Sequence, residues 1–321
     1  MSSEAQTDAV AHRASIEDLL QAGTHFGHLT SRWNPKMKHY VFMERNGIHI
    51  IDLTKSQTML DAAADAAARF ARQGKSILFA GTKKQAREIL RKHAEACDTP
   101  YVVERWLGGT LTNFQTIRKS IRRMEDLVKM EEDGTLAQLK KKERLMRARE
   151  REKLEKVLMG ISNMARLPGA LFIVDINREH IAVKEARKLG IPIIAMVDTN
   201  CDPDLVNFPV PSNDDALKSI DLIAGVISNA IAEGKKQRES QAAEEKAAQQ
   251  RHAEEKEAQE EGAKPKKTRR TKKEASADSG SSDDGGADES KQVAAAKKSA
   301  PAEETAESAE ADSDASEESE D

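Results

Sequence analysis

The histidines and aspartates that could bind a metal ion lie in two distant parts of this 321-residue chain. His25 and His28 are three residues apart, and the acidic candidates come much later: Asp198, Asp202, Asp214 and Asp215. Asp198 follows an apolar run, which places its carboxylate at the carboxyl edge of a sheet, where open α/β folds bind ligands. Because imidazole and carboxylate ligands suit zinc, we select His28, Asp198 and Asp214 as the metal candidates and zinc as their ion. The alternative is that the aspartates cap helices and the histidines form hydrogen bonds in the core.

Two segments combine cations with a tryptophan. They are Arg32-Trp-Asn-Pro-Lys-Met-Lys38 and Arg105-Trp-Leu-Gly-Gly-Thr-Leu-Thr-Asn113. Arg and Lys pair with phosphates, aromatic rings stack on unpaired bases, and glycines allow a close backbone approach, so both segments are suited to RNA. Either indole could instead belong to the core. The predicted RNA-binding residues are Arg32, Trp33, Lys36, Lys38, Lys83, Lys84, Arg105, Trp106, Asn113 and Arg118.

The segment Ala80-Gly-Thr-Lys-Lys84 resembles a phosphate-binding turn, because it follows a strand and begins a helix. It lacks the Gly-x-x-x-x-Gly-Lys-Ser/Thr spacing of a nucleotide-binding loop. Its amides and lysines would suit a nucleic-acid phosphate equally well, and an ordinary strand–helix turn needs no ligand. No Ser/His/Asp order or carboxylate pair stands out elsewhere, so the sequence contains no positive indication of an enzyme.

Apolar runs alternate with amphipathic segments along the elements that must position these residues. We expect strands at 47–52, 76–80, 101–103, 170–174 and 191–197, and helices at 15–22, 54–73, 83–94, 181–189 and 214–232. Continuous apolar strands that alternate with amphipathic helices predict a parallel sheet covered on both faces, which is a doubly wound α/β fold.

Residues 114–164 have a different pattern. Ile117, Ile121, Met124 and Leu127 recur at helical spacing, Asp133-Gly134-Thr135 is a turn signal, and a second, strongly basic helical segment follows. Two amphipathic helices around a tight turn predict an inserted antiparallel coiled-coil hairpin. Its charged outer edge is suited to solvent, with RNA or protein as alternatives. The α/β domain then comprises residues 15–113 and 165–234, after a flexible N-terminus of residues 1–14.

The last 87 residues differ from the rest in composition. Of the 51 Lys+Arg and 55 Asp+Glu of the chain, they hold 16 and 24, so this segment has a net charge of −8 and residues 1–234 have +4. They include no aromatic residue, and Val293 is their only aliphatic side chain larger than alanine, so residues 235–321 are predicted to be a charged low-complexity tail that forms no second globule, with disorder beyond Gly262. Residues 235–261, rich in Glu, Ala, Lys and Gln, are expected to extend the final helix.

Several classes of protein are excluded by the same composition. No apolar run approaches the roughly 18 residues of a membrane span, and the first 14 residues do not form a secretory signal. Cys97 and Cys201 stand outside any Cys-x-x-Cys spacing, which indicates two reduced thiols in a cytoplasmic protein.

In their order along the chain, several motifs resemble the bacterial family of small-subunit ribosomal protein two. They are Gly23-Thr-His-Phe-Gly-His28, Arg32-Trp-Asn-Pro-Lys-Met37, Ile77-Leu-Phe-Ala-Gly-Thr-Lys83, Arg105 to Asn113, Val197-Asp-Thr-Asn-Cys-Asp-Pro203 and Pro211-Ser-Asn-Asp-Asp215. The resemblance implies a flavodoxin-like domain with an inserted coiled coil and a structural role in the ribosome without catalysis. It also implies contact with small-subunit ribosomal RNA and neighbouring ribosomal proteins, and docking of the large mRNA-capturing first protein of that subunit. It assigns no role to the tail, whose basic run Lys266–Lys273 departs from the family.

Two other functions remain open from the residues alone. A nucleotide-binding enzyme would need the Gly81 turn to hold a small ligand. A scaffold that binds only proteins through its coiled coil would not need the segments around Trp33 and Trp106.

Overall fold

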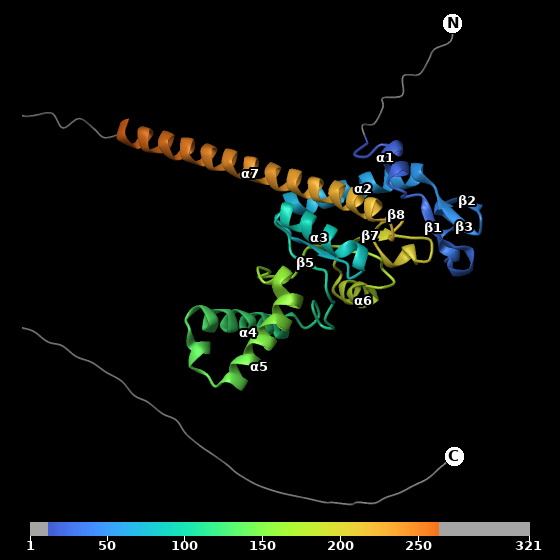
Figure 1. Ribbon diagram of the computed structural model, residues 1–321. Coiled ribbons are helices and arrows are strands. Elements are labelled where there is room, and N and C mark those ends of the chain that lie inside the picture. Colours follow the sequence, from blue (N-terminus) through green and yellow to red (C-terminus); the bar gives the residue numbers. More distant parts are fainter. Residues whose placement is uncertain (1–11, 263–321) are drawn as a thin grey trace, which may run out of the picture. The chain divides into compact units, whose positions relative to one another are not determined.

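A five-stranded parallel sheet forms the centre of the computed structural model, which describes residues 12–262 (Figure 1). Its strands are β4 (Ile77–Ala80), β5 (Tyr101–Val102), β6 (Ala170–Val174), β7 (Ile193–Val197) and β8 (Phe208–Pro211), arranged in the order β5-β4-β6-β7-β8. Numbered within this sheet, the order is 2-1-3-4-5, which is that of flavodoxin-like folds. The predicted α/β fold with a parallel sheet is therefore confirmed.

Successive residues of the central strands belong to two different apolar layers. In β4, Ile77 and Phe79 join one core cluster, whereas Leu78 and Ala80 join the other. β6 and β7 alternate in the same way, and the rings of Phe79 and Phe172 meet edge to face at 5.1 Å between the strands. A strand buried on both faces has no polar side to show, which explains its unbroken apolar sequence.

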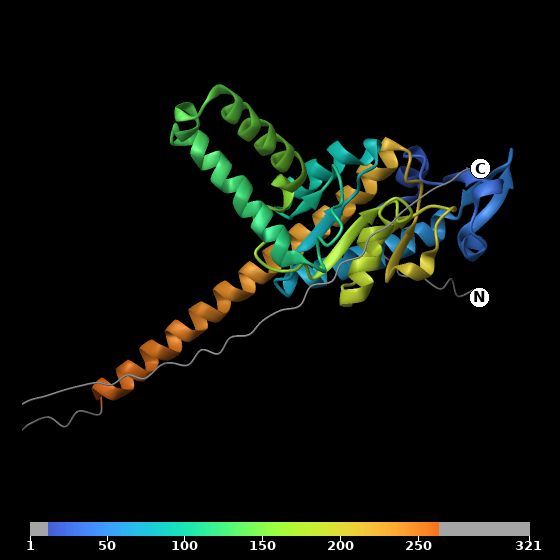
Figure 2. The same cartoon turned by 90° about the horizontal axis from the view of Figure 1, so that it is seen from below.

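Helices cover both faces of this sheet (Figure 2). One core cluster contains residues of α2 (Leu53–Arg72), α3 (Lys84–Ala96) and α7 (Leu217–Gly262). The other contains α6 (His180–Leu189) and residues from the segment between β5 and β6. The carboxyl ends of the strands are thereby left as the edge at which loops collect.

A second, smaller sheet precedes α2. It contains β1 (Phe26–Leu29), β2 (Val41–Arg45) and β3 (Ile48–Ile51) in the antiparallel order β1-β3-β2. We had expected only the strand at 47–52. Helix α1 (Ile16–Gln21) begins with a capping box formed by Ser15 and Asp18, and the short 3-10 helices η1 (Thr30–Arg32) and η2 (Pro35–Tyr40) connect β1 to β2.

The segment between β5 and β6 contains two longer helices, α4 (Phe114–Glu132) and α5 (Lys141–Leu158), which contact each other. The 3-10 helix η3 (Thr135–Gln138) connects them, and η4 (Met159–Ile161) follows α5. Gly134 has φ +71° in the predicted turn. At the base of the pair, Ile117, Ile121 and Ile161 belong to the same apolar cluster as Leu78 of the sheet, so the base is continuous with the core.

Helix α7 continues far beyond its contacts with α2 and α3, and it confirms the predicted extension through residue 261 (Figure 1). Among residues 12–262, no helix has the combination of length and apolar composition that a bilayer-spanning helix needs. The first 11 residues, the rest of the tail after residue 262 and the basic run Lys266–Lys273 lie outside the described residues.

Candidate functional site

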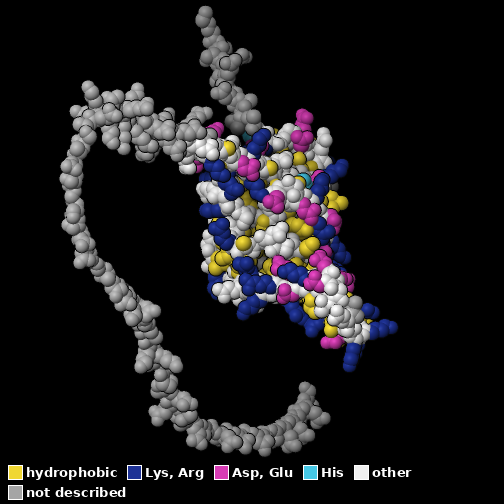
Figure 3. Space-filling model, turned by 90° about the vertical axis from the view of Figure 1, so that its left-hand side faces the viewer, with side chains coloured by type: hydrophobic (Ala, Val, Ile, Leu, Met, Phe, Trp, Pro, Cys, Tyr) yellow, Lys and Arg dark blue, Asp and Glu magenta, His cyan; other side chains and the backbone are white. Residues whose placement is uncertain are grey.

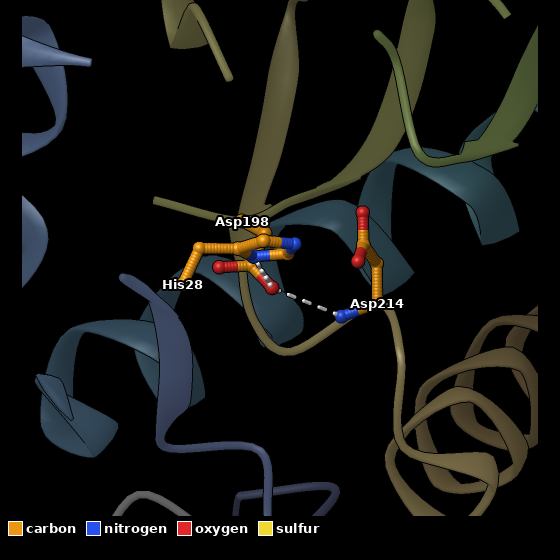
Figure 4. Close-up of side chains that lie close together, drawn as sticks. All are labelled: His28, Asp198 and Asp214. Atoms are coloured by element: carbon orange, nitrogen blue, oxygen red, sulfur yellow. Dashed lines mark hydrogen bonds and ion pairs between the residues drawn. The ribbon is translucent and has the colours of Figure 1, made fainter. Parts of the chain in front are cut away.

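Three side chains from distant parts of the chain meet at the carboxyl edge of the sheet (Figure 4). His28 lies on β1, Asp198 directly follows β7, and Asp214 follows β8. One possible ligand atom from each lies within 4.8 Å of the others, and His28 Nδ1 is 3.1 Å from Asp198 Oδ2. The backbone amide of Asp214 donates to Asp198 Oδ2 over 3.3 Å. The structure thus brings together the three predicted metal candidates.

The remaining candidates of that set have other partners. Asp202 pairs with Lys36 Nζ at 2.8 Å and caps η5 (Pro203–Leu205) by accepting from the Asp204 amide. Asp215 lies 3.5 Å from His28 Nε2 and is half exposed. His25 is outside the three-residue group. The alternative of capping therefore holds for Asp202 but not for the buried pair Asp198 and Asp214.

The cluster is strongly acidic and largely closed to solvent. The side chains of Asp198 and Asp214 are fully buried, and Asp175 at the end of β6 lies close to Asp214. Burial raises the pKa of Asp214 to about 7, assisted by the charges of Asp198 and Asp175 and opposed by Lys83. The neighbouring Asp198 raises the pKa of His28, although burial opposes that shift.

One buried atom of this cluster, Asp214 Oδ2, has no hydrogen-bond partner among the described residues. His28 Nδ1 lies 3.1 Å from Asp198 Oδ2, so that carboxylate is its partner. A buried polar atom without a partner costs free energy, and an imidazole beside two carboxylates is a set of donors that can coordinate one cation. The donor set and geometry therefore fit a metal ion such as zinc.

The Gly81–Lys83 turn binds a carboxylate of the protein itself, that of Glu179. The buried carboxylate of Glu179 accepts from the backbone amide of Thr82 at 2.7 Å and from its hydroxyl at 2.5 Å. Gly81 itself is needed for packing, since a Cβ there would lie 2.5 Å from Leu90 Cδ1. Lys83 Nζ is 2.6 Å from carboxylate oxygens of both Asp214 and Asp215.

This arrangement bears on the nucleotide-binding alternative. The turn stands at the point where the strand order reverses, which is where flavodoxin-like folds bind their ligand. Here the Thr82 amide and the Lys83 ammonium are occupied by Glu179 and by the Asp214–Asp215 pair. Lys84, the first residue of α3, is exposed and has no carboxylate partner among the described residues. The geometry therefore favours no small nucleotide in this turn.

The segment around Trp33 retains two unpaired cations. Arg32 and Lys38 are exposed and pair with no carboxylate of the described residues, whereas Lys36 Nζ is 2.8 Å from both Asp202 and Asp204. Trp33 is half-buried, and its ring lies 4.8 Å from that of His49. Only part of the indole is therefore available for stacking.

The segment around Trp106 differs from the expectation. Trp106 is 6 % exposed, and its Nε1 donates to Glu185 Oε1 at 3.2 Å, so the prediction that this indole contacts RNA is corrected: it is a core residue. The same buried carboxylate accepts from the backbone amides of Gly109, Leu111 and Thr112. Arg105 and Asn113 remain exposed beside it.

The other predicted RNA-binding residue near this segment is Arg118. It is exposed on α4, and its Nη1 donates to the carbonyl oxygen of Ala165 at 3.2 Å. Of the predicted RNA-binding cations, those that are exposed and have no carboxylate partner among the described residues are Arg32, Lys38, Lys84, Arg105 and Arg118. Basic and acidic side chains are intermixed on the face drawn in Figure 3, so this face has no continuous basic patch.

Sequence reasoning missed the two glutamates of α6 that fill these turns. Their partners lie more than 70 residues away, which local spacing cannot reveal. The sequence does contain one indication that Glu185 is buried, because it shares a helix face with the apolar residues Ala182, Val183 and Ala186. A carboxylate on an apolar helix face needs internal donors, which points to a loop folded around it.

Taken together, the features define a flavodoxin-like α/β protein with a smaller antiparallel sheet, an acidic cluster at the carboxyl edge and separate exposed cations. Comparison with known proteins specifies the family. The family described as Ribosomal protein S2 matches residues 19–234, and the chain belongs to that family.

Individual relatives of this chain carry the name of the same family. A protein of Salinibacter ruber named small ribosomal subunit protein uS2 is 64% identical over 234 residues, which cover 73% of each chain. The uS2 protein of Chlorobium phaeovibrioides is 58% identical over 226 residues, which cover 70% of this chain and 88% of that one. The family is a structural, non-enzymatic component of the cytoplasmic ribosome.

Proposed function

We propose that this protein is a structural constituent of the small ribosomal subunit and that it binds ribosomal RNA through isolated exposed cations. The observation that supports the RNA contact is the difference between the predicted cations. Lys36 and Lys83 are neutralised by carboxylates, whereas Arg32, Lys38, Lys84, Arg105 and Arg118 have no such partner among the described residues. An unpaired cation can exchange its counterions for a phosphate without breaking an internal ion pair.

Sedimentation of the full chain with small subunits tests this proposal. Small subunits depleted of this protein are mixed with the wild type or with an alanine triple variant at Arg32, Lys38 and Arg105. A control triple variant replaces Arg72, Lys188 and Lys218, which are also exposed but lie outside the predicted set. We expect the first variant to bind at least tenfold more weakly and the second to bind like the wild type. Equal binding of both variants would contradict the assignment of these cations.

We propose that α4 and α5 form an antiparallel coiled coil inserted into the α/β domain, which comprises residues 15–113 and 165–234. Leu154 and Val157 of α5 pack against the cluster that contains Ile117 and Ile121 of α4, and Arg151 bridges the helices to Glu131. Ile121 of α4 is part of the apolar cluster against which Leu154 of α5 packs. We therefore expect cysteines introduced at 121 and 154 to form a disulfide more readily than cysteines introduced at 122 and 153.

We propose that His28, Asp198 and Asp214 bind a zinc ion, which would fix β1 to the loops after β7 and β8. The unpartnered Asp214 Oδ2 and the convergence of one possible ligand atom from each of the three side chains support the proposal. Elemental analysis of the purified chain tests it, with His25→Ala as the control because His25 lies outside the group. We expect about one zinc per chain in the wild type and in the control and a near-complete loss in His28→Ala; equal zinc in all three would contradict the site.

The family resemblance also suggests that this protein docks the large mRNA-capturing first protein of the subunit. Phe42 on β2 is 70% exposed and offers a large apolar side chain to a protein partner. We expect Phe42→Ser to weaken retention of that protein on purified subunits without altering entry of this chain. Unchanged retention would place the partner elsewhere.

A further inference from the structure

A single buried carboxylate organises the loop of residues 103–113. Glu185 Oε1 accepts from the Gly109 amide at 2.8 Å and from Trp106 Nε1 at 3.2 Å. Its Oε2 accepts from the amides of Leu111 at 2.9 Å and Thr112 at 3.0 Å, and from the Thr112 hydroxyl at 3.1 Å. The loop is thus folded around an internal anion, in the way that backbone amides surround a bound phosphate.

The loop has a tight local conformation around this anion. Gly109 has φ +88°, and Thr110 turns back to the Leu107 carbonyl through both its amide and its hydroxyl. Within residues 12–262, Glu185 forms no ion pair with a Lys or Arg, and its hydrogen bonds come from neutral donors. Burial by itself would raise the pKa of the Glu185 carboxyl, but the amides of Thr112, Leu111 and Gly109 outweigh it and hold the pKa below its ordinary value.

The outer side of the same loop is exposed. Arg105, Gly108, Thr112 and Asn113 face solvent, and a Cβ at Gly108 would meet no atom within 4 Å. Because the amides of residues 109, 111 and 112 are directed to Glu185, they are not available to a phosphate of another molecule. What the loop can offer to RNA is its outer side chains and the open backbone at Gly108.

We propose that the buried carboxylate of Glu185 is a positioning group for RNA docking, which holds the 103–113 loop in the conformation that contacts ribosomal RNA. This inference rests on the proposed function, since it assumes that the chain docks on small-subunit RNA. Glu185 itself is 7% exposed and touches no RNA; it acts through the loop.

The substitution Glu185→Gln tests the role of the charge with little change in size. A glutamine has one oxygen, so whichever way the amide turns, its NH₂ group meets the donors of Gly109 and Trp106 or those of Leu111 and Thr112. Glu179→Gln is a matched control from the start of the same helix. Glu179 is also buried, but both of its hydrogen bonds reach a single oxygen, which glutamine retains.

Two measurements on the full chain separate loop position from docking. The first is the emission of Trp106 in a Trp33→Phe background, which leaves Trp106 as the one remaining tryptophan of the sequence. The second is binding to small subunits depleted of this protein. For Glu185→Gln we expect a red-shifted emission and at least tenfold weaker binding, with a cooperative thermal transition retained; for Glu179→Gln we expect neither change.

Several outcomes would overturn the inference. Wild-type binding by Glu185→Gln, with or without a shift in emission, would show that the held conformation is not needed for docking. An unchanged emission would show that Glu185 does not hold the loop. If Glu185→Gln fails to fold, Gly109→Ala takes its place, because a side chain at φ +88° would be strained and its Cβ would lie 3.2 Å from that of Asn113.

The proposed function can fail separately. If the wild type does not bind depleted subunits, the RNA-docking function is wrong and docking by this loop is wrong with it. The emission of Trp106 in the free protein would still decide whether Glu185 holds the loop.

Discussion

The dependence of binding on salt should reveal how many cations contact RNA. Each contact with a phosphate releases condensed counterions, and the logarithm of the binding constant falls by roughly 0.7–0.9 per contact for each tenfold rise in salt. The five exposed cations Arg32, Lys38, Lys84, Arg105 and Arg118 therefore predict a slope of about −4. Between about 50 and 200 mM salt, binding should weaken roughly 100- to 500-fold.

Removal of three of these cations should flatten the dependence. The triple alanine variant at Arg32, Lys38 and Arg105 retains two contacts, so its slope should be about −1.6 and its loss over the same salt range roughly tenfold. Lys36→Ala is the control, because Lys36 is already paired with Asp202 and Asp204 and should leave the slope unchanged. Binding to depleted subunits is measured by sedimentation at several salt concentrations. A triple variant with the wild-type slope would refute the count and the reasoning that separates paired from unpaired cations.

Three further predictions concern the folded structure. At pH values above the ordinary carboxyl pKa, the unfolding free energy of the wild type should exceed that of Glu185→Gln. The difference should vanish as the pH falls through the lowered pKa of Glu185. Denaturant titrations at several pH values measure it. Truncation after Gly234 should cost about 1 kcal/mol more than truncation after Glu239, because only the shorter chain lacks Lys235. Lys235 Nζ donates to the carbonyl oxygen of Cys97, the C-cap of α3, at 2.7 Å and to that of Asp98 at 2.6 Å; calorimetry measures the difference. Replacement of residues 125–150 by a short Gly-Ser linker should leave a cooperative thermal transition. Replacement of residues 114–164 should lower the midpoint of that transition strongly, because only the longer deletion removes the base of the helix pair, which packs on the sheet.

The central sheet could be predicted because its strands are buried on both faces. β4, β6 and β7 are unbroken apolar runs between helices, and each lies within one or two residues of its expected position. β8 could not be predicted in this way, because Pro209 and Pro211 interrupt its pattern. Proline is tolerated there because β8 is an edge strand that pairs only with β7. The strands β1 and β2 are short and largely exposed, so they lack the apolar signal of the core.

The acidic cluster was partly predictable for a topological reason. Asp198 ends an apolar strand, and the carboxyl ends of parallel strands share one edge, so this position follows from local sequence. The approach of His28 depends instead on the small sheet. There the Thr199 hydroxyl accepts from the His28 amide at 2.8 Å, and a Cβ at Gly27 would lie 2.5 Å from that side chain. Such a contact across 171 residues has no signature in the spacing of either segment.

The two glycine-containing turns show why motif reasoning could not identify the partner of their backbone amides. Both present backbone amides in an arrangement suited to an anion, and both were therefore attractive as phosphate sites. In each, a glutamate of α6 supplies the anion: Glu179 to Thr82, and Glu185 to residues 109–112. A turn of this kind indicates that an anion is needed, but it does not indicate from which molecule the anion comes. Here Glu185 of α6 and the N-cap residue Glu179 fill the two turns, so these backbone amides are satisfied within the fold and the proposed RNA contact falls to the exposed side chains around them.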